Sequence, residues 1–150
     1  MPQSFTCLHY HLVFGTKHRE PTITPAIRPR LYPYLGGLIR AEGGHPVTIG
    51  GMPDHVHILA RLGQAKALAD VMRVVKTNSS KWVHDTFPEA VGFGWQTGYG
   101  AFTIGQSSLD AVRRYIEDQE EHHKKRSCQD EFRAMLRQHG IEFDERYLWD

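Results

Sequence analysis

The stretch VTIGGMPDHVHILARL, residues 47–62, contains two short apolar runs separated by Met-Pro-Asp. Proline and aspartate are common in turns, so the pattern predicts two short strands, at about residues 47–51 and 56–62, joined by a turn. Side chains two positions apart in a strand point to the same face. His55 and His57 are therefore expected to project together from one face of the second strand.

The rest of the chain supplies the other elements of an α+β fold. In residues 5–16, apolar and aromatic residues alternate with histidines, as in a strand with one buried face. The other expected elements are a helix at about 24–42, a helix beginning near Leu68, a strand at about 99–104, a helix from Ser107 or Ser108 to about 124, and a short helix at about 129–138. The order β-α-β-β-α-β predicts a ferredoxin-like antiparallel sheet with helices on one face, followed by a C-terminal helix. The other face of such a sheet stays open to polar side chains.

The first predicted helix contains prolines that disfavour an uninterrupted helix. Thr24 is a suitable N-cap and Pro25 suits the first helical position. Pro29 and Pro33 fit poorly in a helix interior, because proline lacks the backbone N–H and crowds the preceding turn. We therefore expect a late start, a kink or a short first turn.

The composition is that of one globular domain, residues 1–150. The chain is 40% hydrophobic and 23% charged, which is ordinary for a folded domain. No apolar run approaches the length of a membrane span, and no signal peptide opens the chain. Cys7 and Cys128 do not make a disulfide framework, so a reducing cytoplasm is the expected location, with no membrane partner.

The charge is distributed unevenly along the chain. The net charge is only +1, but residues 1–83 carry ten Lys or Arg against four Asp or Glu, whereas residues 84–150 carry eight against thirteen. A basic first half is compatible with phosphate binding, although a solvated surface without a partner explains the same composition. Charge therefore permits a nucleic-acid partner without requiring one.

The paired histidines are the first candidate for chemistry. Two neutral imidazoles projecting from one strand face can hold a divalent metal ion. The spacing alone is weak evidence, because the chain has ten histidines and a second pair, His9 and His11, on the first strand. Histidines on half-exposed strands are also common without a metal.

A second candidate lies on the helix after the last strand. Tyr115 and Gln119 are four residues apart, so on a continuous helix they share a face. The Gln119 amide oxygen is able to complete a metal site with the two histidines, which would leave Tyr115 beside any phosphate held there. The alternative is that Tyr115 lies at the edge of the core and Gln119 on the surface.

Taken together, these motifs strongly resemble the IS200/IS605 family of single-tyrosine transposases, part of the wider class of HUH endonucleases. The likeness rests on MPDHVHIL at 52–59, on Tyr115 and Gln119 with three residues between them, on YHLVFGTKHR at 10–19 and on WQTGYG at 95–100. It covers a shared core of about residues 5–124, with a C-terminal extension beyond it.

The resemblance implies specific roles for these residues. His55, His57 and Gln119 would be metal ligands, and Tyr115 would be the nucleophile on a catalytic helix. Family members are homodimers that recognise hairpins in single-stranded DNA, cleave nearby through a 5′-phosphotyrosine linkage and rejoin strands. Whether Tyr115 acts in its own subunit or across the dimer is left open.

The implied chemistry is physically reasonable. Mg²⁺ or Mn²⁺ would neutralise charge on the scissile phosphate, and mixed imidazole and amide ligands suit Mn²⁺ as well. A tyrosine with its usual pKa near 10 needs help to ionise, from the metal or a neighbouring base.

Basic residues near these motifs are candidates for contacts with the DNA backbone. The candidates are Lys17 and Arg19 after the first strand, Lys76 and Lys81 on the second helix, and Arg113 and Arg114 beside the tyrosine. Tyr10, Trp95 and Tyr99 are candidates for stacking on unpaired bases, although such aromatics more often belong to the core.

Two other functions remain open from the residues alone. The chain is compatible with an inactive or domesticated single-stranded nucleic-acid-binding module, which would use the sheet, the basic residues and the aromatics without chemistry. It is also compatible with a metal-dependent hydrolase of small phosphate esters, in which Tyr115 only orients the substrate.

Overall fold

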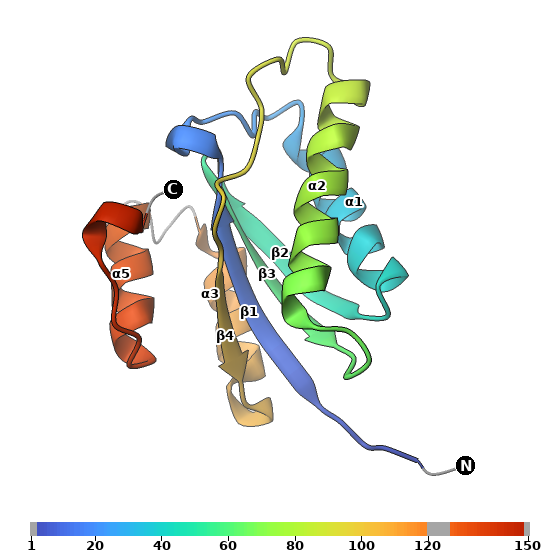
Figure 1. The fold of residues 1–150 in the computed structure, drawn as a ribbon, viewed down its shortest axis with the longest axis vertical. Coiled ribbons are helices and arrows are strands. Elements are labelled where there is room, and N and C mark those ends of the chain that lie inside the picture. Colours follow the sequence, from blue (N-terminus) through green and yellow to red (C-terminus); the bar gives the residue numbers. More distant parts are fainter. Residues whose placement is uncertain (1–2, 120–126, 149–150) are drawn as a thin grey trace.

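The computed structural model describes residues 3–119 and 127–148, and it forms a sheet flanked by helices on both sides (Figure 1). The strands are β1 (Leu8–Gly15), β2 (His45–Met52), β3 (His55–Leu62) and β4 (Gly100–Ile104). The helices are α1 (Arg28–Ala41), α2 (Leu68–Thr86), α3 (Leu109–Glu117) and α5 (Cys128–Gln138), with short 3-10 helices at Lys17–Arg19, Gln106–Ser108 and Glu145–Tyr147.

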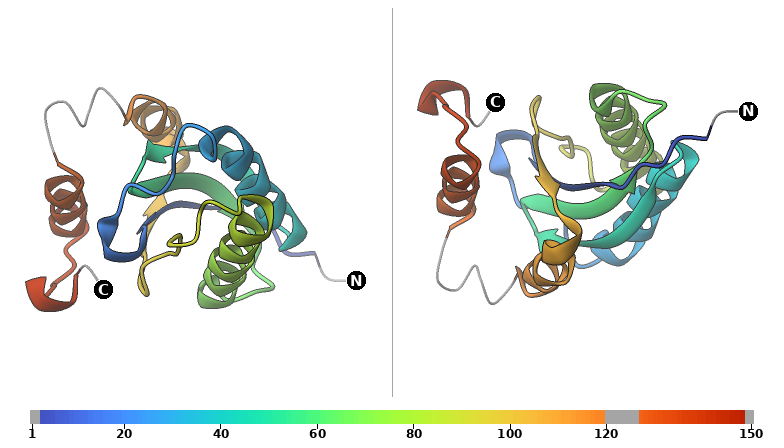
Figure 2. Two further views of the ribbon diagram at one scale, coloured as in Figure 1. Left: turned by 90° about the horizontal axis from the view of Figure 1, so that it is seen from above. Right: turned by 90° about the horizontal axis from the view of Figure 1, so that it is seen from below.

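The sheet has the order β2-β3-β1-β4, and all three strand pairs are antiparallel. The predicted ferredoxin-like arrangement is confirmed: two β-α-β units interlock so that β1 and β3 are central neighbours. Figure 2 shows α1 and α2 together on one side of the sheet, whereas α3 and α5 lie apart from each other on the opposite side, with α5 packed on β1 and β4.

The main hydrophobic core lies between the sheet and the pair α1 and α2. Alternate residues of the strands face this core, which explains the period of two in the sequence. The buried members from the strands include Leu12, Phe14, Val56, Ile58, Ala60 and Leu62, and those from the helices include Leu31, Leu35, Ile39, Val71, Met72, Val75 and Val83.

The opposite face of the sheet carries the histidines. In the β1–β3 register Val13 pairs with His57, and in the β2–β3 register Gly50 pairs with His57, so these three positions share that face. A smaller apolar cluster of Val13, Phe102 and Leu136 lies there, with Phe132, Met135, Phe143 and Leu148 packed against it. The histidine face is therefore covered by α3 and by the C-terminal segment rather than open.

Two helix ends differ from the simplest expectation. The first helix begins late, at Arg28, with proline in its first turn, as the prolines predicted. The third helix, α3, ends at Glu117, and a turn at Asp118 (φ −100, ψ 27) separates it from Gln119, which is again helical. Acidic side chains at a helix C-terminus meet the negative end of the helix dipole, which favours termination there. The predicted continuation to about residue 124 lies outside the described residues.

Among the described residues, no helix combines the length and the apolar character needed to cross a membrane.

The close approach of α3 to β2 depends on Gly50 and gives a first prediction. A Cβ on Gly50 would lie 2.4 Å from the Ile116 carbonyl oxygen, whereas a Cβ on the exposed helical Gly37 meets nothing within 4 Å. We expect Gly50→Ala to reduce the free energy of unfolding by about 1–3 kcal/mol, since the packed backbone of α3 has to move. Gly37→Ala should be neutral or stabilise the protein by about 0.5–1 kcal/mol. Urea denaturation of both variants measures the difference; equal stabilities would contradict this packing.

Candidate metal and tyrosine site

His55 and His57 meet a buried carboxylate on the histidine face of the sheet. The Glu131 Oε1 atom lies 2.8 Å from Nε2 of His57 and 3.8 Å from Nε2 of His55. One ligand atom from each of these three residues falls within 4.8 Å of the others. All three side chains are at most 2% exposed. Two imidazole nitrogens and a carboxylate oxygen at such distances form a donor set that fits a divalent metal ion.

The other ring nitrogens of both histidines have partners that fix the ring orientations. His55 Nδ1 lies 2.8 Å from Asp54 Oδ1, and His57 Nδ1 lies 2.7 Å from Nε2 of His11. A neutral His11 is able to accept a hydrogen bond from His57 Nδ1–H, and loss of the Nε2 proton that faces Glu131 would leave a lone pair of His57 for a metal. Such outer partners are typical of histidine metal ligands.

The pKa values of these groups follow their surroundings. Burial and the neighbouring His57 lower the pKa of His11 to about 3, so this imidazole is neutral. Burial also opposes the charged form of His55, but the hydrogen bond to Asp54 and the proximity of Cys128 raise the pKa of His55 to about 10. For Glu131, burial opposes ionisation, yet the hydrogen bonds from His57 and Tyr115 hold its pKa at about 2. The carboxylate is therefore charged at neutral pH.

Tyr115 reaches the same carboxylate from α3. Its hydroxyl donates a hydrogen bond to Oε2 of Glu131, the oxygen not facing the histidines. The Tyr115 ring centroid lies 6.0 Å from that of His57 and 6.3 Å from that of His11. The tyrosine thus lies beside the histidines of its own chain. Ile116, fully buried against β2, anchors this turn of α3.

Gln119 also reaches the site, although it lies beyond the end of α3. Its Oε1 is 3.3 Å from Nε2 of His55, and its Nε2 donates to the Tyr115 carbonyl oxygen at 3.3 Å. The residue is 2% exposed. The four side chains singled out in the sequence are therefore brought together, with the amide oxygen of Gln119 directed at His55.

Glu131 is the member of the site that the sequence analysis did not identify. It lies on α5, where Cys128 and Leu136 are buried and Phe132 and Met135 are partly buried. These positions have the spacing of one helix face, and Glu131 falls within it. A charged residue on the apolar face of a short helix was thus the available signal.

The site is reached from a groove of about 390 Å³ between β4, α3 and α5. Its lining includes His11, Tyr115 and Glu131, together with small and polar residues of the two helices. His55 and His57 lie behind Glu131 and do not line the groove. A substrate entering here meets the tyrosine hydroxyl and the carboxylate first.

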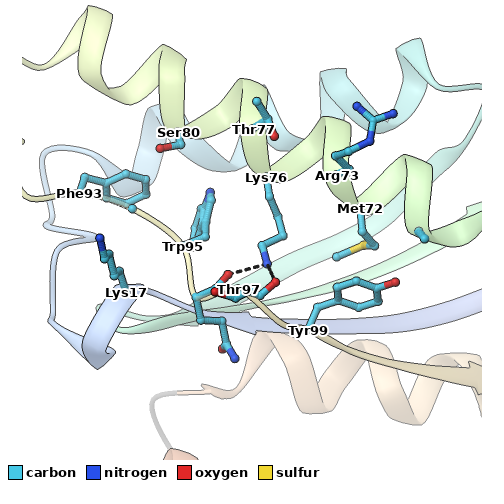
Figure 3. A pocket seen from close by; sticks show the side chains of 13 residues that line it. Lys17, Met72, Arg73, Lys76, Thr77, Ser80, Phe93, Trp95, Thr97 and Tyr99 are labelled. Carbon is cyan, nitrogen blue, oxygen red and sulfur yellow. Dashed lines mark hydrogen bonds between the residues drawn. The ribbon is translucent and has the colours of Figure 1, made fainter. Parts of the chain in front are cut away.

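Lys76, a candidate for phosphate contact, is already hydrogen-bonded to the protein backbone. Its ammonium donates hydrogen bonds to the carbonyl oxygens of Gln96, Thr97 and Gly98 at 2.6, 3.0 and 2.8 Å (Figure 3). Burial lowers the pKa of Lys76 to about 8. Lys76 therefore links the loop before β4 to α2. To bind a DNA phosphate, its ammonium group would have to give up hydrogen bonds to this loop.

The other basic candidates lie at several places on the surface. Exposed Lys17 lines the pocket of about 520 Å³ shown in Figure 3, together with Arg73 of α2. Arg19 lies 3.5 Å from Asp54, so it adjoins the partner of His55. Lys81 pairs with Asp85, Arg113 with Glu117, and Arg114 donates to the Asp110 carbonyl oxygen, all on exposed helix surfaces. Their contacts with DNA remain predictions.

The aromatic candidates differ in their accessibility. Trp95 packs edge-on against Phe14 and donates its indole N–H to Ser79, which makes it part of the helix-side core. Tyr10 also packs against that core. Tyr99 is 37% exposed at the pocket of Lys17, so it is the most exposed of the three, and Trp95 also lines this pocket.

Comparisons with known proteins agree with this fold and show the family of the chain. The family model described as "Transposase IS200 like" matches residues 4–119, and the chain therefore belongs to this family of DNA transposases. The ISDra2 transposase TnpA of Deinococcus radiodurans is 26% identical over 117 residues, covering 75% of this chain and 84% of that protein.

Two solved structures share the fold. One is the crystal structure of a Deinococcus radiodurans R1 protein described as a transposase, with a TM-score of 0.63, 24% identity and coverage of 79% of this chain and 98% of that one. The other is a REP-associated tyrosine transposase bound to a REP hairpin, with a TM-score of 0.57, 12% identity and coverage of 79% and 70%.

Proposed function

We propose that this transposase cleaves and rejoins single-stranded DNA at hairpin-flanked element ends through a 5′-phosphotyrosine intermediate formed by Tyr115. The main support for the proposal is that the tyrosine hydroxyl and two histidine rings surround one carboxylate. The Tyr115 hydroxyl and both imidazole Nε2 atoms lie around Glu131. A nucleophile beside a divalent-metal donor set is what phosphodiester transesterification needs.

The residues present fit a divalent metal, which we propose to be Mg²⁺ or Mn²⁺ held by His55, His57 and Gln119. The Nε2 atoms of the histidines face Gln119 and Glu131, while their Nδ1 atoms are engaged by Asp54 and His11. When bound, such an ion would polarise the scissile phosphate and offset the charge that develops on it.

The proposed reaction exchanges one phosphodiester for another. The Tyr115 oxygen loses its proton and forms a bond to phosphorus, while the bond to the 3′ oxygen of the neighbouring nucleotide breaks and that oxygen gains a proton. In the rejoining step, a 3′ hydroxyl from a second end attacks the phosphotyrosine, and the phenol oxygen leaves. Each step replaces one P–O bond by another, so no external energy source is required.

A DNA hairpin is the proposed partner. The support comes from the fold-related tyrosine transposase that was solved with a REP hairpin, and from the basic first half of this chain. A homodimer and a cytoplasmic location are further proposals that follow from the family resemblance. Tyr115 lies beside the histidines of its own chain, which supports action within one subunit.

The test uses single-stranded oligonucleotides that carry the hairpins flanking the coding region, labelled at either end and incubated with protein and Mn²⁺. We expect a covalent adduct, stable to SDS, that carries the 3′ label, together with a released 5′-labelled fragment that a polymerase can extend. Binding without any cleavage would favour the inactive binding module. Cleavage by water with multiple turnover and no adduct would favour a phosphoesterase.

The partner of His55 gives a prediction about metal affinity. Asp54→Asn removes the carboxylate that accepts from His55 Nδ1. Loss of such a partner should weaken Mn²⁺ binding about 10- to 100-fold, because the ring is less well oriented and less basic. Titration calorimetry with Mn²⁺ measures the change. Asp70→Asn, at an exposed carboxylate on α2, is the control. Equal Mn²⁺ affinities of the two variants would show that Asp54 does not contribute to metal binding.

A further inference from the structure

Glu131 belongs to a segment that the family match does not include. The family model ends at residue 119, whereas α5 begins at Cys128. Glu131 nevertheless occupies the centre of the site, 2% exposed, with one carboxylate oxygen toward the histidines and the other accepting from Tyr115. An element outside the family core thus contributes a charged group between the metal ligands and the nucleophile.

The position of Glu131 is determined by the packing of α5. Ser127 caps the helix by accepting from the backbone N–H of Asp130. One turn further, Phe132 lies so close to β4 that a Cβ on Gly100 would approach its ring to 2.6 Å. Leu136 is buried in the cluster with Val13 and Phe102, and His139 stacks on Phe102 at 4.6 Å. Glu131 is therefore held at the histidines by an anchored helix.

The distances around Glu131 match those between ligands of one ion. Donor atoms at adjacent positions of a six-coordinate Mg²⁺, each about 2.1 Å from the ion, are about 3 Å apart. Here Oε1 of Glu131 lies 2.8 and 3.8 Å from the two histidine Nε2 atoms, and the Gln119 amide oxygen lies 3.3 Å from His55 Nε2. The donors of His55, His57 and Glu131 all lie within 4.8 Å of one another, and the Gln119 oxygen adjoins His55, so the three donors are close enough for one ion after a small movement of the side chains.

The chemistry of the donor set supports the same conclusion. Two imidazoles and one amide are neutral ligands, whereas Mg²⁺ and Mn²⁺ prefer carboxylate oxygens. Glu131 would supply the anionic ligand that the other three lack.

We propose that Glu131 is a fourth protein ligand of the metal and that its second oxygen positions the Tyr115 hydroxyl, so that α5 completes the active site. This inference rests on the proposed function. The carboxylate joins the metal and the nucleophile through one side chain, which sets the distance between them. The alternative is that Glu131 only occupies the place of the substrate phosphate and has to leave before DNA binds.

The test compares Mn²⁺ binding by the full-length wild type, Glu131→Gln and Asp130→Asn. Glutamine keeps the shape of Glu131 and removes its charge, and Asp130→Asn removes the same charge from an exposed neighbour on the same helix. The free Mn²⁺ signal in electron paramagnetic resonance gives the affinity. We expect at least a tenfold loss for Glu131→Gln and less than a twofold change for Asp130→Asn. Unchanged or tighter binding by Glu131→Gln would overturn the proposal.

A second measurement is independent of stability and affinity. With saturating Co²⁺, the visible absorption bands report the ligands of the ion, and they should differ between wild type and Glu131→Gln but not between wild type and Asp130→Asn. Identical spectra of Glu131→Gln and wild type would exclude a ligand role.

The positioning role has its own readout. At saturating Mn²⁺ and DNA, Glu131→Gln should form the covalent adduct at least tenfold more slowly, with unchanged affinity for the hairpin. A faster reaction would instead identify Glu131 as an occluding group.

Different results would contradict the proposed function and this inference. If the wild type binds Mn²⁺ with the help of Glu131 but forms no adduct with any hairpin substrate, the ligand assignment stands and the strand-transfer function falls. If the wild type forms the adduct and Glu131→Gln binds Mn²⁺ like the wild type, only the present inference falls.

Discussion

Tyr115→Phe should abolish the covalent protein–DNA adduct, reducing cleavage by about 10⁴-fold or more, as expected when a nucleophile that acts as part of a catalytic unit is lost. The substitution removes one oxygen atom, and that oxygen is the group placed against Glu131. The ring still packs beside His57 and His11, so the fold and the histidine arrangement should persist.

The same variant should retain the binding properties that do not need the hydroxyl. Hairpin affinity should stay within a few-fold of the wild type, and so should Mn²⁺ affinity, because Tyr115 is not among the proposed ligands. Tyr147→Phe is the matched control, since it removes a phenol oxygen from a 67% exposed side chain in the C-terminal segment. An undiminished adduct in Tyr115→Phe would show that another residue is the nucleophile.

The sheet and its two faces could be predicted from the sequence because they depend on local periodicity. Alternation in β1 places Leu12 and Phe14 on the core side and His11 on the other, and the same period in β3 separates Val56 and Ile58 from the two histidines. The element order also predicts that β1 and β3 are neighbours in the sheet. The contact between His11 of β1 and His57 of β3 is a result of this pairing.

The end of α3 could not be located by periodicity. A continuous helix was the simplest way to bring Gln119 to the face of Tyr115, but a turn at Asp118 interrupts the helix, and the side chain of the helical Gln119 donates to the Tyr115 carbonyl oxygen. Helix ends depend on a balance of capping and packing that spacing does not reveal. The proximity of the two side chains was predictable, whereas the backbone path between them was not.

The roles of Glu131 and Lys76 depend on long-range contacts. Glu131 reaches the site only because Phe132 and Leu136 dock α5 on the β1 and β4 side of the sheet. Lys76 looked like a phosphate contact on the polar side of a helix, yet a loop twenty residues further on supplies three carbonyl acceptors. The apolar face of α5 marks Glu131 as unusual, but the groups that Glu131 and Lys76 contact cannot be read from the local sequence.

Removal of the metal is expected to have the largest effect after loss of the tyrosine. EDTA treatment of the wild type should suppress adduct formation by about 10³-fold or more, since charge on the phosphate is no longer offset. Excess Mn²⁺ should restore it. Hairpin binding should survive EDTA, because contacts of basic side chains with the DNA backbone do not require the ion. Undiminished cleavage in EDTA would exclude a metal-dependent mechanism.

His57→Asn tests the metal dependence of cleavage by changing a proposed ligand instead of removing the ion. The change removes an imidazole whose Nε2 and Nδ1 face Glu131 and His11, so Mn²⁺ binding and cleavage should both be lost. It also leaves the buried Glu131 carboxylate short of a partner, which should cost about 3–5 kcal/mol of stability. His45→Ala, at an exposed histidine on the edge strand β2, is the control and should keep metal affinity and activity. Because His57→Asn is expected to be less stable, its activity is measured well below its melting temperature. If the folded variant binds Mn²⁺ with wild-type affinity at that temperature, His57 is not a ligand of the ion.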